Sequence, residues 1–233
     1  MDAIAENNLR CWAYRFNDSR FFEEDPIIFP KRFVSLAAQG RASMKDVETA
    51  AVFAAHLAWG RRAMIVRDLE RLFSEMDWKP YDYVMKGEWR DETASIHRTV
   101  KWKDIAAICS RLKRAFLNGD SLEKYSVEQL RCDIYGSAPD KNAANKKINM
   151  MRRWMVRSDG KVDLGVWTDT DPAVLLIPLD VHVHRSASQL GLTSRKSADA
   201  RTVEEITSVF RKIFPEDPCL GDFALFGHSL TKE

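Results

Sequence analysis

The stretch 175–192, LLIPLDVHVHRSASQLGL, sets the fold that we expect for this chain. Apolar residues and one proline lead to a single carboxylate, Asp180, and apolar residues at helical spacing follow it directly. Aspartate is a favoured N-cap, because its side-chain oxygen accepts a hydrogen bond from an unpaired backbone N–H of the first turn. Gly191 ends the run, as glycine often does after a helix. We therefore expect Asp180 at a helix N-terminus, at the edge of an apolar wall. In an arbitrary protein, such a residue is usually a cap and nothing more.

Two short motifs in this chain resemble the helix-hairpin-helix DNA glycosylase superfamily. The segment 178–185, PLDVHVHR, is similar to the V-D-x-H-V-x-R segment that carries the catalytic aspartate of that superfamily. The segment 146–152, KKINMMR, is similar to the pattern in which a catalytic lysine opens the preceding helix. The resemblance places Lys146 on that lysine and Asp180 on that aspartate. The long separation of the two residues is nearest in layout to the archaeal 8-oxoguanine DNA glycosylases.

That resemblance implies an all-α, two-lobed helical fold, with one domain over residues 1–233 and a cleft near Lys146 and Asp180. It implies excision of a damaged base from DNA, with an oxidised base expected and with or without strand cleavage. In this chemistry an amine attacks the sugar C1′ and a carboxylate stabilises positive charge on the sugar as the base departs. Lys147 is the alternative nucleophile, since a shift of one residue is possible in so divergent a hairpin.

Nearly the whole chain resembles a second group, an uncharacterised bacterial family with a domain of unknown function that is placed near those glycosylases. The residues that carry this second resemblance form four groups of motifs: Asp25-Pro26-Ile27 with Pro30-Lys31-Arg32-Phe33, then 148–157 (INMMRRWMVR), 163–167 (DLGVW) and 222–227 (DFALFG).

Composition limits the class of protein without naming it. The chain has 233 residues, 45% of them apolar, which suffices for one large domain or two lobes. It shows no secretory signal pattern and no apolar run long enough to span a membrane. Four cysteines occur without a C-x-x-C pair, which argues against a zinc site or a disulfide framework. We therefore expect a cytoplasmic monomer with mostly buried thiols, no metal and no cofactor.

Most of the chain shows helical patterns. Ser43 with Asp46 begins the first long helical pattern, and Ser126 with Gln129 and Thr202 with Glu205 have the spacing of capping boxes. Pro26 and Pro30 are expected to bracket an extended piece before a short helix. The remaining helices are expected within 7–24, from 62 to about 76, and over 101–117, 143–156 and 223–230.

The expected DNA contacts are cationic or polar residues near helix ends: Arg61, Arg62, Lys147, His182 and Arg185. Arginine and lysine commonly bind phosphate oxygens. The glycosylase superfamily turns the corner that corresponds to 59–62 towards DNA. Residues 141–157 include six basic and no acidic side chains, although such a run is often only a solvated helix face. The stretch 136–142, GSAPDKN, lacks the Gly-x-Gly of the superfamily's phosphate-binding hairpin.

Two other functions compete with excision. His182 and His184 beside Asp180 suggest a metal hydrolase if they lie on a strand, but on a helix their side chains point apart. A nucleic-acid-binding module that kept the fold and lost catalysis is favoured by the missing Gly-x-Gly. Lys146 and Asp180 argue against that module, and Lys-dependent covalent trapping on DNA separates the two.

Overall fold

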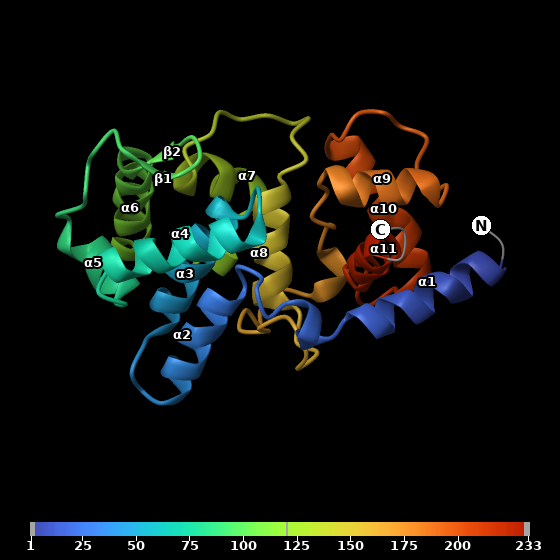
Figure 1. Cartoon of the computed structure of the whole chain (residues 1–233), viewed down its shortest axis with the longest axis horizontal. Coiled ribbons are helices and arrows are strands. Elements are labelled where there is room, and N and C mark those ends of the chain that lie inside the picture. The colour runs from blue at the N-terminus through green and yellow to red at the C-terminus, as the bar shows by residue number, and fades with distance from the viewer. Residues whose placement is uncertain (1–2, 120, 231–233) are drawn as a thin grey trace. The chain divides into compact units, whose positions relative to one another are not determined.

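The computed structural model describes residues 3–119 and 121–230, and within them it is an all-α protein (Figure 1). The expected fold class is confirmed at this level. Three short 3₁₀ turns, a π-helical turn at Leu130–Ile134 and one small β-hairpin accompany the α-helices. The helices of the described residues are α1 (Ala3–Phe16), α2 (Ile28–Ala38), α3 (Met44–Leu57), α4 (Arg62–Glu75), α5 (Pro80–Lys86), α6 (Trp102–Leu117), α7 (Val127–Gln129), α8 (Lys146–Val156), α9 (Val181–Gln189), α10 (Ala200–Ile213) and α11 (Leu220–Leu230).

The chain divides into two compact units. The central unit is Phe22–Pro139 and holds α2 to α7. The terminal unit joins Met1–Phe21 to Asp140–Glu233 and holds α1 and α8 to α11. Both residues that we expect to be catalytic, Lys146 and Asp180, belong to the terminal unit.

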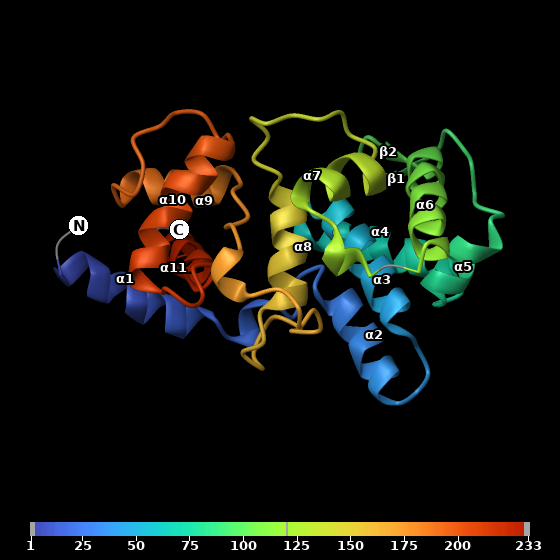
Figure 2. The same ribbon diagram turned by 180° about the vertical axis from the view of Figure 1, so that it is seen from behind.

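Helix α3 is the core of the central unit. Its residues from Val47 to Ala55 are all buried, and α2, α4 and α5 pack against it. The helix begins after Ser43, as expected, and a capping box forms there: Ser43 Oγ accepts from Asp46 N at 3.3 Å, and Asp46 Oδ2 accepts from Ser43 N at 2.8 Å. Strands β1 (Ser95–His97) and β2 (Val100–Lys101) form the hairpin that leads into α6 (Figure 2).

The prediction of an extended segment between Pro26 and Pro30 is wrong. Helix α2 begins at Ile28, and Pro30 lies inside its first turn. A proline is tolerated there because the first N–H groups of a helix have no intrahelical partner to lose.

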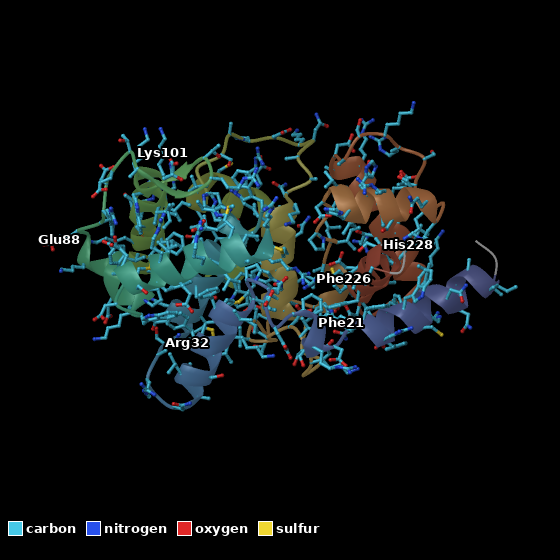
Figure 3. The ribbon with its side chains drawn as sticks, in the orientation of Figure 1. Phe21, Arg32, Glu88, Lys101, Phe226 and His228 are labelled. Atoms are coloured by element: carbon cyan, nitrogen blue, oxygen red, sulfur yellow. The ribbon has the colours of Figure 1, made fainter. Side chains whose placement is uncertain are left out.

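The terminal unit is organised around α11, which packs against α1, α9 and α10. Phe16, Phe21 and Phe226 form an aromatic cluster between the N-terminal segment and α11, with ring centroids 5.1 to 6.3 Å apart (Figure 3). Gly227 permits this approach, because a Cβ there would lie 2.0 Å from the ring of Phe16. The C-terminal motif is therefore first of all a packing motif.

The expected start of α10 is also wrong. Its N-cap is Asp199, whose Oδ1 accepts from Thr202 N at 3.0 Å, so that the helix begins before Thr202. The Thr202 hydroxyl is buried and bonds outside the helix, donating to the Ser197 carbonyl and accepting from Arg195 Nε.

The structure also bears on the expectations for membrane-spanning helices and for buried thiols. Within the part of the chain described, no helix is both long and apolar enough to cross a membrane. Of the four thiols, only Cys109 and Cys219 are buried, whereas Cys132 is partly covered and Cys11 is exposed.

Candidate functional site

Asp180 caps α9 with one of its two oxygens. Oδ1 accepts from His182 N and from Val183 N, both at 2.9 Å, so neither capping bond uses Oδ2. The residue is half-buried, and the apolar segment before it is buried at Leu175, Ile177 and Leu179. The expected N-cap at the edge of an apolar wall is confirmed. Its second oxygen leaves room for a further role.

Lys146 is the first residue of α8. We expected this helix from Ala143, but Asn145 adopts the left-handed conformation (φ 49°, ψ 37°), which asparagine tolerates better than most residues. The helix therefore opens on Lys146 itself, as in the resembled pattern. Lys146 and Lys147 are both half-buried. Asn149 is buried, and its Nδ2 donates to the Ala144 carbonyl at 3.1 Å.

Asp222, on α11, is a second carboxylate in the neighbourhood of Asp180. Its side chain is buried, its Oδ2 lies 2.5 Å from Arg153 Nη1, and its Oδ1 has no hydrogen-bond partner. Burial raises the pKa of Asp222 to about 6; Arg153 opposes this rise, and the charges of Asp180 and Asp163 add to it. Two carboxylates from different helices thus lie close enough to influence each other.

A buried ion network anchors Asp222. Arg153 on α8 also contacts Asp163, and Arg157 at the end of α8 binds Asp163 and pairs with Asp217 at 2.8 Å. Arg157 Nη2 also reaches Asp159 at 3.0 Å. Two guanidiniums therefore contact four carboxylates, and one of these carboxylates, Asp222, is raised in pKa by the charge of Asp180.

The ring of Phe223 packs against both arginines of this network. Arg153 and Arg157 both lie over its ring, with Cζ atoms 4.7 and 5.0 Å from the centroid. Gly221 is required next to it, since a Cβ there would lie 2.2 Å from Phe210. Three of the sequence motifs (148–157, 163–167 and 222–227) thus meet in one buried cluster.

Sequence reasoning missed this cluster. We weighed the basic run 141–157 as a phosphate-binding surface or a solvated face, but Arg153 and Arg157 are only 5% and 1% exposed. One signal was present: Arg153 and Arg157 lie about one helical turn apart, and the apolar residues Trp154, Met155 and Val156 stand between them in the sequence. The core assignment of Ile148, Met151 and Met155 is confirmed.

The raised pKa of Asp222 predicts a pH dependence of stability. In the unfolded chain this carboxyl titrates near 3.8, and in the folded protein near 6. Between these values the folded state binds more protons, so the contribution of Asp222 to stability falls as pH rises through this window. At 1.36 kcal/mol per pKa unit, the effect is on the order of 3 kcal/mol. We expect Asp222→Asn to remove this slope in urea unfolding at pH 4.5 to 7. An unchanged slope would contradict the shifted pKa.

Arg157→Met is expected to destabilise the protein by about 3–5 kcal/mol, the usual cost of removing one partner from a buried ion pair. The carboxylates of Asp163 and Asp217 would lose a shared guanidinium, and the Asp163 side chain has no exposure to water. Chemical denaturation measures the loss. Arg20→Met is the matched control, because the Arg20–Asp18 pair lies at the surface, and we expect it to leave the unfolding midpoint nearly unchanged. Equal effects of the two substitutions would contradict a structural role for the network.

The other expected contact residues of the terminal unit lie on α9. His182 and Arg185 are exposed. His184 is half-buried, and its Nε2 donates to the Arg195 carbonyl at 2.9 Å. Both histidines are helical, which is the arrangement in which their side chains diverge. Among the described residues, no group of three or more His, Cys, Asp or Glu side chains is placed to hold a metal ion.

Arg61 and Arg62 lie in the central unit, at the corner between α3 and α4. Both are exposed. The corner is tight: Trp59 N donates to the Leu57 carbonyl at 2.7 Å, and Gly60 has φ +110°. The structure therefore places the arginines at a corner as expected, in a different unit from Lys146 and Asp180.

Fold and site together define an all-α protein in which a helix-capping carboxylate neighbours a buried arginine–aspartate network. The chain belongs to the family described as "Protein of unknown function (DUF2400)", whose model matches residues 25–137 and 127–231. The resemblance to an uncharacterised family is thereby confirmed, and the resemblance to DNA glycosylases stays a prediction. No match was found among curated proteins or among solved structures.

Proposed function

We propose that this protein excises a damaged, oxidised base from DNA with Lys146 as nucleophile and Asp180 as the essential carboxylate. The observation that supports it most is the capping geometry of Asp180. Both capping bonds use Oδ1, and the residue is half-buried, so a fixed Oδ2 can act on a bound nucleotide. Lys146 opens α8 in the same compact unit.

The chemistry needs one amine and one carboxylate. Lys146 Nζ forms a bond to the sugar C1′ while the bond from C1′ to the base breaks, and the base leaves with that electron pair and takes up a proton. The attached nitrogen gives up one of its protons, and its lone pair forms the C=N bond of a protonated Schiff base while the ring oxygen leaves C1′ with the electron pair of its bond and takes up a proton from water. The carboxylate of Asp180 stabilises the positive charge that develops on the sugar and can accept protons in later steps.

The exposed cations fit a DNA partner. Arg61 and Arg62 in the central unit, and His182 and Arg185 on α9, are all exposed. Lys147, beside the nucleophile, is half-buried. Contacts of this kind to phosphate oxygens position a protein on a duplex without reading its sequence.

A non-catalytic nucleic-acid-binding module is the second candidate, and the turn before α8 favours it. Asp140 occupies two backbone N–H groups there: its Oδ1 accepts from Asn142 N at 2.9 Å, and its carbonyl accepts from Ala143 N at 3.2 Å. These N–H groups are bonded within the turn, whereas in the Gly-x-Gly hairpin the backbone N–H groups bind a phosphate.

Borohydride trapping tests the proposal. The full chain is incubated with duplexes that carry an abasic site or one of a panel of oxidised bases, and borohydride reduces any Schiff base to a stable amine. We expect a covalent protein–DNA complex with at least one duplex. If the protein binds the duplex but neither traps nor excises any lesion on the panel, the excision proposal is contradicted and the non-catalytic module is favoured.

A further inference from the structure

The corner between α3 and α4 exposes a tryptophan. Trp59 is 38% exposed, which is more than any other tryptophan of the described residues. A large aromatic ring is costly to leave in water, because its burial contributes substantially to stability. Part of the Trp59 ring is therefore available for contact with a ligand.

Residues far along the chain hold Trp59 in place. Its carbonyl accepts from His97 Nε2 at 2.9 Å, and the His97 ring meets the Trp59 ring edge-on at 5.5 Å. His97 is itself buried, and its Nδ1 lies 2.8 Å from Asp68 Oδ2. The backbone and one edge of the exposed tryptophan are thus fixed by a buried histidine on the β1 strand.

Arg98 lies against the same ring. Its guanidinium carbon is 4.4 Å from the Trp59 centroid, which is within the range of a cation–π contact. The Arg98 side chain crosses the backbone at Gly60, where a Cβ would lie 2.7 Å from Nη1. Gly60 also has φ +110°, a conformation that other residues rarely adopt. The corner therefore needs glycine at this position to bring Arg98 onto Trp59.

Three exposed arginines lie at the corner. Arg61, Arg62 and Arg98 are exposed around Trp59, and the first turn of α4 contains no acidic residue. Asp68, which holds His97, is buried and also accepts from Arg67. An exposed aromatic ring flanked by guanidiniums matches a ligand that combines a flat π-system with anionic groups.

We propose that Trp59, Arg61, Arg62 and Arg98 form a stacking platform for an unpaired base of a nucleic-acid strand, with the guanidiniums on its phosphates. Stacking on a rigid aromatic ring is open to any base, whereas a paired base in a duplex hides its face. The proposal rests on the proposed function only in taking nucleic acid as the partner. It adds a requirement for an unpaired nucleotide and two residues, Trp59 and Arg98.

The test compares a short labelled oligothymidine with the same strand in a duplex, by fluorescence anisotropy on the full chain. We expect Trp59→Ala to weaken single-strand binding by about 10-fold or more and to weaken duplex binding less. Trp59→Phe keeps a ring and should retain most of the affinity. Arg98→Ala should also weaken binding, whereas Arg32→Ala is the matched control, since Arg32 lies 3.6 Å over another tryptophan, Trp78.

Several results would overturn the platform: no single-strand binding by the wild-type chain, an unchanged affinity in Trp59→Ala, or equal losses for single strand and duplex. If Trp59→Ala fails to fold, Trp59→Phe with Arg98→Ala decides, and equal losses in Arg98→Ala and Arg32→Ala would then contradict the proposal. The strands are undamaged and no excision is measured. A failed trapping experiment with intact strand binding therefore contradicts only the proposed function, and the reverse pattern contradicts only the platform.

Discussion

Lys146→Ala is expected to abolish the covalent complex that borohydride traps, while the affinity for duplex DNA changes little. Alanine has no amine, so no Schiff base can form at this position. Alanine is also the best helix former, so α8 should still begin at residue 146. Gel electrophoresis of the trapped complex measures the loss, and the melting temperature shows whether the fold survives.

Lys147→Ala is the matched control, since Lys147 is the next residue of the same helix and is equally half-buried. It should keep trapping and lose at most some affinity for phosphates. Undiminished trapping in Lys146→Ala would contradict the proposed nucleophile. Loss in Lys147→Ala alone would assign the reaction to Lys147.

Local sequence patterns predicted the helices whose ends are made by neighbouring residues. The helix start at Ser43 and the cap at Asp180 both form as expected, because each needs only residues within the next turn. The start of α10 was missed for a related reason: Asp199 and Thr202 both have side chains that cap, and tertiary bonds of the Thr202 hydroxyl decide which one does. Helix α2 was missed at its start because a proline within the first turn looks like a break in sequence.

Local sequence patterns could not predict the buried arginine–aspartate network. Arg153 bonds Asp163, 10 positions away, and Asp222, 69 positions away, and nothing in the spacing of these residues indicates that they meet. Asp180 was found through its cap and its resemblance, but its electrostatic neighbour Asp222 became visible only in the folded chain. The sequence thus predicted a carboxylate at a helix start and not the charged side chain of Asp222 near it.

Those surroundings make Asp180→Asn a sharper probe than alanine. Asp180→Ala removes a cap, which typically costs about 0.5–2 kcal/mol, so that lost activity would be ambiguous. Asparagine caps about as well as aspartate, and its side-chain oxygen can accept from His182 N and Val183 N as Oδ1 does. The fold and the melting temperature should therefore survive the substitution.

Asp180→Asn does remove the negative charge of residue 180, and we expect two consequences. Without a carboxylate at residue 180, the pKa of Asp222 should fall from about 6, because the charge of Asp180 helps to raise it; carboxyl-carbon NMR measures this shift independently of any activity. Asparagine also cannot offset positive charge on the sugar or accept a proton, so excision of the best substrate should slow by about 10² or more. Binding to DNA should persist and can tighten for want of one repelling carboxylate. A lowered Asp222 pKa with an unchanged excision rate would show that Asp180 is a cap and an electrostatic neighbour only, and the glycosylase proposal would lose its central support.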